Sequence, residues 1–361
     1  MDKDNSNYDR RINFYLGKQL SNNVNIANTY SNKIHIDDFD KIKANKEHYQ
    51  KPFKHLLCKT KHETDAFYVK FGDVTSVSHP LELAKNRCSG NEDSVLLRSL
   101  EFDRHWGNYY ARPNDMPFNK KRNVVCWRGT TTGNPNKKGN RFDLVKRWFG
   151  KDRINIGFSN ICQNRNGYKR FVKGHRDISW FLKFKYIISV EGNDKDSGIN
   201  WKLNSNSLVF MPKPRVTSWL METTLVPNVH YILLKDDFSD LRQKLNWCNN
   251  HPNKCKNIIK NAHKFMAQFA NKRQEEQLEV DLVHKYFNIM KQIDENNTKS
   301  SIVPQLDVDL VHMKQIDEDN TKSSIVPQLE VDLVQEKYED GDNTKTSIVP
   351  QLLPGLMLIQ S

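Results

Sequence analysis

The fold is decided by residues 186–241, which read YIISVEGNDKDSGINWKLNSNSLVFMPKPRVTSWLMETTLVPNVHYILLKDDFSDL. Two short apolar runs, YIISV and SLVF, are each followed by a polar or glycine-bearing loop. A third run, HYILL, leads into DDFSDL, an acidic helix start. Strands that end in loops and alternate with helical segments indicate an α/β layer with a ligand site at its strand ends.

A second strand is predicted upstream at residues 123–127 (NVVCW), and it runs directly into RGTTTG. Exposed backbone N–H groups and hydroxyls suit phosphate oxygens, and Arg128 can bind them bidentately. Neither a P-loop nor a GxGxxG pattern is present, so a flexible polar loop is the alternative. The helical spacing of residues 142–149 (FDLVKRWF) places a helix behind this loop and favours an anion site.

A third strand, AFYVKFGD at residues 66–73, ends in the turn-forming pair Gly72-Asp73. A carboxylate at that position faces the crevice where α/β folds bind ligands, although a solvated turn aspartate is the alternative. The next loop contains further polar candidates, which are ligand-facing groups or ordinary packing and turn residues. They are Asp103, Arg104, His105 and Asp115.

The rest of the chain supplies another strand at residues 154–160 and a helical region after residue 241. That region has apolar residues at three- and four-residue spacing, which predicts core or domain-bridging helices. One face is formed by Ile258, Ile259, Ala262, Phe265, Met266 and Phe269. Residues 1–65 are polar and Asn/Lys-rich, and we expect them to be a loosely packed lead-in.

Charge is distributed unevenly along the 361 residues, a length that allows two domains. The formal net charge is +13, but residues 271–361 hold 9 Lys+Arg against 17 Asp+Glu. The first 270 residues are therefore strongly basic. Such a body favours anionic partners, namely nucleic acid, membrane phosphates or a nucleotide-bearing substrate.

The six cysteines form no CxxC pair and have no histidine cluster beside them, which argues against a metal site. Cys248 and Cys255 are the closest pair for a disulfide, but nothing requires one. The first residues have no apolar signal region, no stretch reaches the length of a membrane span, and the last residues carry no retention signal. These features predict a cytoplasmic protein with reduced thiols and no transmembrane segment.

The C-terminal tail is a tandem repeat. NTKSSIVPQL begins at Asn297 and again at Asn320, and NTKTSIVPQL begins at Asn343. Each unit has one proline and few large apolar residues, so three units cannot bury a solenoid core. We expect residues 297–361 to be an acidic, mostly disordered appendage, which is either an interaction tail or a neutral expansion.

Three separated stretches together resemble a known family. They are YVKFGD at residues 68–73, CWRGTTTG at 126–133, and the EGND, WKLxSNSLVF, WLME, PxxHY and DFSDL elements of residues 186–241. In order and spacing they resemble glycosyltransferase family 90, which groups capsule- and lipopolysaccharide-modifying sugar transferases with the protein O-glucosyltransferases. The resemblance covers roughly residues 66–270.

The resemblance implies a GT-B architecture, in which two Rossmann-like domains face each other across a cleft. We expect an acceptor-side domain at residues 66–120 and a nucleotide-sugar-binding domain at 121–270. A terminal helix at 271–296 and the tail would follow. The implied reaction is an inverting, metal-independent transfer from a UDP-sugar, usually UDP-glucose or UDP-xylose, to a glycan, lipid-linked or protein acceptor. The UDP-sugar is a donor substrate, and no cofactor is implied.

The resemblance also assigns site residues. Asp73 matches the carboxylate that acts as catalytic base. The segment that contacts the diphosphate corresponds to Arg128, Gly129, Thr130, Thr131 and Gly133. The nucleotide loop and its surroundings correspond to Gly192, Asn193, Lys195, Lys202, Ser207 and Glu222, and Glu222 stands where such folds hold a ribose or sugar hydroxyl.

Two departures from the family leave alternatives open. The protein O-glucosyltransferases have an arginine where this chain has Gly198, so Lys195 or Lys202 would have to supply the charge as a point donor. The missing signal peptide argues against folded EGF-like domains as acceptors. A transferase fold that serves as an inactive scaffold is one alternative.

The other alternative is a basic nucleic-acid binder. The aromatic residues that motivate it are Trp106, Tyr109, Tyr110, Trp127 and Trp148. Dispersed cations and the lack of an RNA- or DNA-binding motif argue against it.

Overall fold

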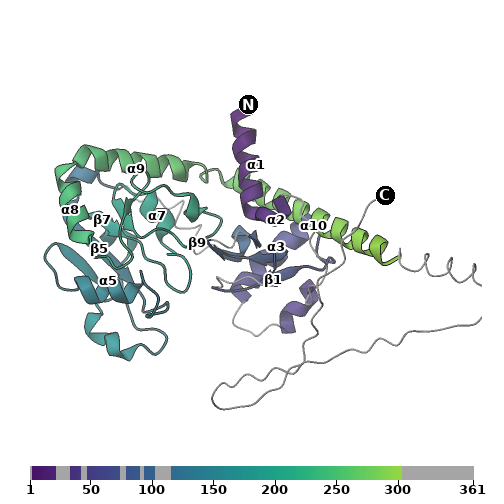
Figure 1. Ribbon diagram of the computed structural model, residues 1–361, viewed down its shortest axis with the longest axis horizontal. Helices are drawn as coiled ribbons and strands as arrows, with labels where there is room; N and C mark the ends of the chain where they lie inside the picture. Colours follow the sequence, from purple (N-terminus) through teal and green to yellow (C-terminus); the bar gives the residue numbers. More distant parts are fainter. Residues whose placement is uncertain are drawn as a thin grey trace, which may run out of the picture. The chain divides into compact units, whose positions relative to one another are not determined.

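The computed structural model describes residues 2–21, 33–41, 47–73, 79–89, 93–101 and 115–302 (Figure 1). Most of the repeat tail, residues 303–361, lies outside these ranges. So do six residues that the sequence singled out. They are Asp103, Arg104, His105, Trp106, Tyr109 and Tyr110.

A five-stranded parallel sheet has the strand order β6-β5-β7-β8-β10. Its strands are β5 (Arg122–Gly129), β6 (Ile154–Phe158), β7 (Phe184–Ile188), β8 (Leu208–Met211) and β10 (Ile232–Leu233). The strands predicted at residues 123–127 and 154–160 are thereby confirmed. The chain moves from β5 to one side for β6 and then to the other side for β7. The carboxyl ends of β5 and β7 thus form a topological switch point, where open α/β sheets bind ligands.

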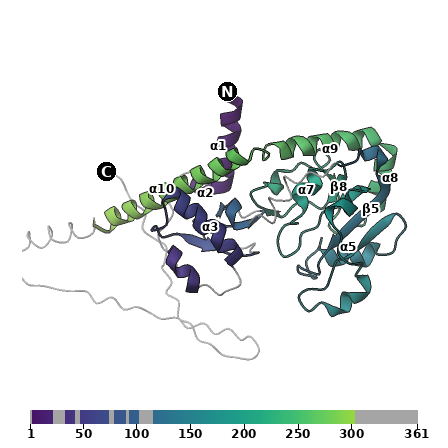
Figure 2. The same ribbon diagram turned by 180° about the vertical axis from the view of Figure 1, so that it is seen from behind.

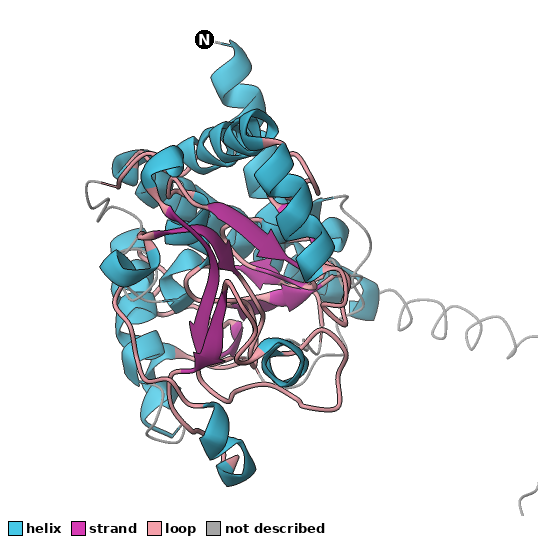
Figure 3. Cartoon of the chain, turned by 90° about the vertical axis from the view of Figure 1, so that its left-hand side faces the viewer, coloured by secondary structure: helices cyan, strands magenta, loops and turns pink. Residues whose placement is uncertain are grey.

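This sheet is buried on both faces, which explains why the middle of β5 and most of β6, β7 and β8 are apolar. Val125 and Trp127 of β5 belong to one apolar cluster, together with Phe142 of α5 (Arg141–Trp148). Cys126 belongs to another, together with Phe181 of α6 (Ile178–Phe181). Successive side chains of a strand point to opposite faces, so helices must cover both sides (Figure 3).

Helix α5 begins directly behind the loop that follows β5, as its periodicity predicted. Its N-cap is Asn140, whose Oδ1 accepts a hydrogen bond of 2.8 Å from the backbone amide of Asp143. The remaining helices of this part of the chain are α7 (Ile199–Leu203), α8 (Leu241–Asn250), α9 (Pro252–Ala267), η3 (Phe118–Lys120), η4 (Asn166–Phe171) and η5 (Glu222–Thr224). The cap fixes the start of α5 and hence the direction of the preceding loop.

A second, three-stranded parallel sheet has the order β1-β2-β4. These strands are β1 (Tyr68–Lys70), β2 (Glu82–Ala84) and β4 (Val95–Leu96), and η2 (Arg98–Glu101) follows β4. A separate antiparallel pair joins β3 (Arg87–Cys88) to β9 (Val216–Thr217). Beyond β1, Gly72 adopts φ +107°, which residues with side chains rarely adopt, and it turns the chain so that Asp73 follows the carboxyl end of the strand.

The N-terminal helices form the core of the second sheet together with a helix from the far end of the chain (Figure 2). They are α1 (Asp2–Leu16), α2 (Lys18–Ser21), η1 (Ile36–Lys41), α3 (Glu47–Thr60) and α10 (Lys272–Ile302). Leu16, Phe53 and Leu57 are fully buried there. The expectation of a loosely packed lead-in is therefore wrong for the described part of residues 1–65, because their sparse apolar residues share one helical face.

An ion pair inside this core ties α1 to α10. The Arg11 guanidinium donates to both carboxylate oxygens of Glu275 at 2.6 Å, and the two side chains are 2% and 3% exposed. Replacing Arg11 by methionine leaves a buried carboxylate unpaired, so we expect a loss of about 3–5 kcal/mol in the free energy of unfolding. Urea denaturation measures it, with the exposed neighbour Arg10→Met as the control. A loss equal to that of the control would contradict this role.

Three properties bear on possible sites. Within the described ranges, no helix is long and apolar enough to cross a membrane. No group of three or more His, Cys, Asp or Glu side chains there could hold a metal ion. All six cysteines are free thiols, and the Cys255 thiol contacts the Cys248 carbonyl oxygen at 3.5 Å inside the core.

Candidate active site

A pocket of about 870 Å³ opens where β5 and β7 end. We call it the switch-point pocket. Its wall includes the cations Arg128, Arg141, Arg176 and Lys202, the carboxylates Asp177 and Asp196, and the aromatic residues Trp127, Phe181 and Trp201. The volume is that of a site for a molecule of nucleotide size. Cations outnumber carboxylates along the wall, so the pocket favours an anion.

Arg128, predicted from the sequence, leaves β5 and lies in this wall. Its guanidinium donates to the Trp127 carbonyl at 2.7 Å and to the carbonyl and side-chain oxygens of Asn155, each at 2.8 Å. It also lies 4.8 Å from the centre of the Trp180 ring, while its Nε is buried without a hydrogen-bond partner. Burial, together with nearby Arg176, lowers the pKa of Arg128 to about 10. An anion in the pocket would relieve this cost.

Arg141, which sequence reasoning missed, joins the loops after β5 and β7. This buried side chain donates to Thr132 Oγ1 at 2.7 Å, to the Thr130 carbonyl at 3.2 Å and to the Val190 carbonyl at 3.4 Å. Burial lowers the pKa of Arg141, and the carboxylates of Asp196, Asp194 and, more weakly, Asp73 partly offset that effect. Its direct partners are neutral oxygens, so it can still bind an anion.

The two loops touch through glycines. Gly133 adopts φ +98°, and a Cβ atom there would lie 2.8 Å from the Gly192 carbonyl oxygen. The Gly133 amide donates to Asn193 Oδ1 at 2.9 Å. Gly133, Gly192 and Asn193 line a smaller adjoining pocket of about 360 Å³. Of the predicted residues, Gly129, Thr130, Arg128 and Lys202 line the switch-point pocket itself.

Gly198 cannot be replaced by arginine without rearrangement. A Cβ atom there would lie 2.8 Å from Trp201 Nε1, so the indole occupies the space in which a side chain would begin. Lys202 lies nearby, but its ammonium is paired with Asp196 and donates to the Ile188 carbonyl at 3.2 Å. Burial opposes ionisation of Asp196, but Lys202 and hydrogen bonds hold its pKa below the usual range. The charge of Lys202 is therefore already matched.

Lys195 and Glu222 form their own buried pair and do not line the switch-point pocket. Lys195 Nζ lies 3.2 Å from Glu222 Oε1, and Glu222 accepts from the Ser218 amide at 2.7 Å. The cavity beside them measures about 20 Å³, room for roughly one water molecule. Both side chains hold the loop after β9, so this geometry does not support the expectations that Glu222 holds a sugar hydroxyl and that Lys195 supplies the missing charge, and both stay predictions.

Two other predicted residues serve the fold. The Thr131 hydroxyl is buried; it donates to the Cys162 carbonyl at 2.8 Å and accepts from the Cys162 amide at 2.7 Å. The Ser207 hydroxyl donates to the carbonyl of Phe184, the first residue of β7, at 2.8 Å. Because the strands are parallel, Ser207 lies at the edge of the sheet opposite the switch point. Neither residue lines the switch-point pocket.

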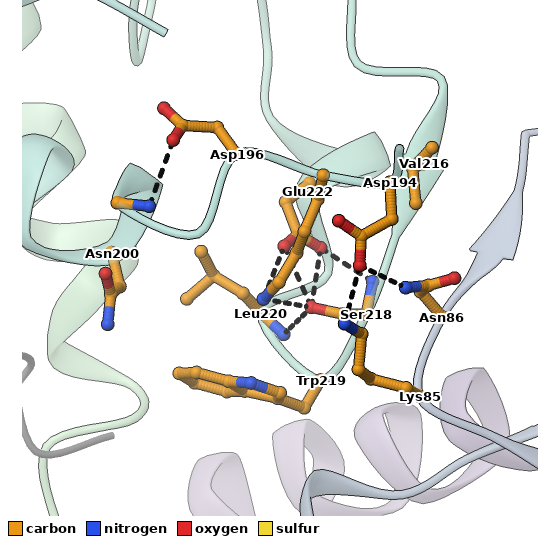
Figure 4. Close-up of polar contacts among 12 residues, drawn as sticks. Lys85, Asn86, Asp194, Asp196, Asn200, Val216, Ser218, Trp219, Leu220 and Glu222 are labelled. Atoms are coloured by element: carbon orange, nitrogen blue, oxygen red, sulfur yellow. Dashed lines mark hydrogen bonds and ion pairs between the residues drawn. The ribbon is translucent and has the colours of Figure 1, made fainter. Parts of the chain in front are cut away.

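Lys85 lies between the candidate base Asp73 and Asp194 of the loop after β7, and Figure 4 shows its contact with Asp194. Lys85 Nζ lies 2.6 Å from Asp73 Oδ1 and 2.6 Å from Asp194 Oδ2. The Tyr49 hydroxyl donates to Asp73 at 3.2 Å, and Asn86 donates to Asp194 at 2.9 Å. The Asp73 side chain remains 35% exposed, so its carboxylate is accessible to a substrate.

With this geometry established, comparison with known proteins assigns the chain to a family. The family model described as Glycosyl transferase family 90 matches residues 101–329. The chain belongs to family 90. The chain is therefore a glycosyltransferase, in agreement with the resemblance drawn from its motifs. The match begins beyond Asp73, so it does not test the prediction that Asp73 is the base.

Relatives of this family 90 chain include named transferases. It is 32% identical over 227 residues to "O-glucosyltransferase LpsA" of Dichelobacter nodosus, an alignment that covers 62% of the chain and 68% of the relative. It is 28% identical over 152 residues to "Protein O-glucosyltransferase 2" of Danio rerio, covering 41% and 29%. A 96-residue stretch is 29% identical to "Uncharacterized protein 179R" of Invertebrate iridescent virus 6, covering 25% and 8%. The chain thus spans less than a third of the last two relatives.

Two further residues named in the sequence analysis, Asp115 and Trp127, have structural partners. Asp115 pairs with Lys121 and accepts from the Asn206 amide at 2.6 Å, which places it beside the starts of β5 and β8. It lies at the wrong edge of the sheet to be the base. Trp127, proposed as a nucleic-acid contact, is almost fully buried: its ring packs against Phe158, and it reaches the surface only at the wall of the switch-point pocket.

The residues that sequence reasoning missed had weak signals. Arg141 is the first residue of a helix just after the RGTTTG loop, and a cation at that place could have been weighed as a pocket residue. Arg176 and Lys85 carry no motif. Arg176 lies in the wall of the pocket, 5.8 Å from the centre of the Trp180 ring. Lys85 follows β2, a three-residue strand that has no recognisable pattern in the sequence.

Proposed function

We propose that this family 90 chain transfers a hexose or pentose, glucose or xylose, from a UDP-sugar to a hydroxyl of a glycan, lipid-linked or protein acceptor. The reaction inverts the anomeric configuration and needs no metal ion. We further assign the five-stranded sheet to the donor-binding domain and the three-stranded sheet to the acceptor-side domain of a GT-B architecture.

The pair Arg128 and Arg141 is the observation that carries this proposal. In the part of the chain that the structure describes, neither guanidinium is hydrogen-bonded to a carboxylate, and both lie in the wall of the switch-point pocket. A diphosphate supplies two anionic groups for such a pair, and guanidinium groups bind phosphate bidentately. The same charges would stabilise the diphosphate as it leaves, a role that metal ions fill in other transferases.

The choice of donor in this proposal is supported by the family and not by the geometry. Family 90 groups transferases that usually take UDP-glucose or UDP-xylose, and two relatives are named O-glucosyltransferases. Glucose is accordingly the first sugar to test. The aromatic wall at Trp201 and Phe181 offers apolar surface for a nucleobase or a sugar face.

Asp73 acts as the base in the proposed step. Its carboxylate takes the proton of the acceptor hydroxyl while that oxygen attacks the anomeric carbon. The bond from the anomeric carbon to the diphosphate oxygen breaks, and its electron pair leaves with UDP. A single displacement of this kind inverts the anomeric centre, and the arginines carry the charge of the departing diphosphate.

A thermal-shift panel tests this function. At a concentration of 100 Kd, we expect UDP-glucose or UDP-xylose to raise Tm by roughly 5 °C, since binding at that level stabilises by about 2.7 kcal/mol. Sugar transfer or donor hydrolysis should persist in EDTA. If no nucleotide sugar shifts Tm while single-stranded nucleic acid does, the transferase proposal is overturned in favour of nucleic-acid binding. Binding without turnover would support the inactive scaffold.

A further inference from the structure

A chain of contacts connects the proposed donor pocket to the proposed base. The loop after β7 touches the loop after β5 through Asn193, whose side chain accepts from the Gly133 amide. The next residue, Asp194, accepts from Lys85 at 2.6 Å, and Lys85 contacts Asp73 at the same distance. The contacts thus run from the pocket loops through Asp194 and Lys85 to Asp73.

The position of Lys85 follows from the second sheet. It comes directly after β2, which pairs in parallel with β1, so Lys85 and Asp73 both lie beyond the carboxyl edge of this sheet. The Lys85 side chain is 2% exposed, and its ammonium lies 5.7 Å from the centre of the Tyr49 ring. An ammonium this buried is stable only where carboxylates surround it, which fixes its place closely.

We infer that Lys85 is a positioning residue for the transfer reaction. It holds the Asp73 carboxylate at the acceptor side, and Asp194 fixes the position of Lys85 relative to the loop after β7. The inference rests on the proposed function, because Asp73 must be the base for its position to matter. Lys85 need not touch either substrate. It acts through the orientation of Asp73.

The alternative is that Lys85 only stabilises the fold. The geometry supports a positioning role, because the Lys85 ammonium contacts both the Asp73 and the Asp194 carboxylates at 2.6 Å. Asn86 gives Asp194 a second hydrogen bond, of 2.9 Å, and Tyr49 gives Asp73 a further one, of 3.2 Å. The two carboxylates are therefore oriented by several donors each, as a site that needs a defined base position requires.

Kinetics of Lys85 variants test the inference. In Lys85→Met we expect kcat to fall about 100-fold, the cost of misplacing a reacting group by about 1 Å, while the Kd for UDP stays within about threefold. Lys85→Arg, which keeps the charge, should recover activity to within about tenfold of the wild type. Asp194→Asn weakens the same contact, and the double variant Lys85→Met/Asp194→Asn should be no slower than Lys85→Met alone.

Two controls separate positioning from stability. Lys121→Met removes another buried ammonium, paired with Asp115 at the far edge of the large sheet, and should lower Tm without changing kcat per folded molecule. In an Asp73→Asn background, Lys85→Met should add no further loss of kcat. An independent loss there, or a kcat for Lys85→Met equal to that of Lys121→Met, overturns the positioning role alone. A wild type that turns over no nucleotide sugar overturns the proposed function and this inference with it.

Discussion

Replacing Asp73 by asparagine is expected to lower kcat for sugar transfer by about 10²–10⁴-fold, the usual contribution of a general base. Asparagine keeps the shape of the side chain and an oxygen that Lys85 and Tyr49 can still bond, but it cannot accept the acceptor's proton. UDP affinity should remain within about threefold of the wild type, since Arg128 and Arg141 are untouched. Initial rates and calorimetric titration with UDP measure the two quantities.

The matched control for this change is Asp65→Asn. Asp65 is an exposed carboxylate just before β1, whereas Asp73 lies just after that strand, and Asp65 contacts His62 at 2.6 Å. The Asp65→Asn variant should transfer sugar at the wild-type rate. An Asp73→Asn enzyme that keeps a tenth or more of its activity would show that another group takes the proton. Asp103, in the segment beyond η2, would then be the next candidate.

Replacing Arg141 by methionine is expected to weaken UDP binding by about 10–100-fold, because a hydrogen bond to a charged group contributes about 1.5–3 kcal/mol. The methionine side chain fills much of the same space but supplies no donor for a phosphate oxygen. Uridine, which has no phosphate, should bind the variant as well as it binds the wild type. Calorimetry with both ligands measures the difference directly.

The control for Arg141 lies on the same helix. Arg147 is exposed near the other end of α5 and pairs with Asp237 at 3.4 Å, so Arg147→Met should bind UDP normally. Arg141 also bonds two loops, and its loss can lower Tm. If Arg141→Met loses affinity for uridine and UDP equally, Arg141 acts through loop structure and not through the phosphates.

The large sheet could be predicted from the sequence because its strands are buried on both faces. NVVCW and INIGF are therefore mostly apolar runs that contain only asparagine and glycine besides, and a glycine- or asparagine-bearing loop follows each. In the second sheet β1 could be predicted because it lies in the aromatic and β-branched run AFYVKF, whereas β2 begins with the charged Glu82 and shows no such pattern. Helix α1 was missed because its polar residues outnumber the few apolar ones that make its buried face.

The site could be predicted where a residue lies next to a strand end, as Arg128 and Asp73 do. The site could not be predicted where a residue's role depends on whether its charge is paired with a carboxylate. Lys195, Lys202 and Arg141 are all cations near the loops, yet only Arg141 lacks a carboxylate partner among the described residues. Glu222 pairs with Lys195 and Asp196 pairs with Lys202. The spacing of these residues in the sequence does not indicate which cation each carboxylate contacts.

The packing of α1 against α10 affects the order in which the two cores can form during synthesis of the chain. The apolar cluster that joins β5, β6 and α5 lies within residues 118–259, a continuous stretch that is synthesised before α10. The other core joins Ile12 to Met290, so its two ends are separated by almost the whole described chain. Helix α1 is synthesised long before α10, so the apolar face that it buries in this core stays incompletely covered until α10 has been made, and transiently exposed apolar surface favours aggregation.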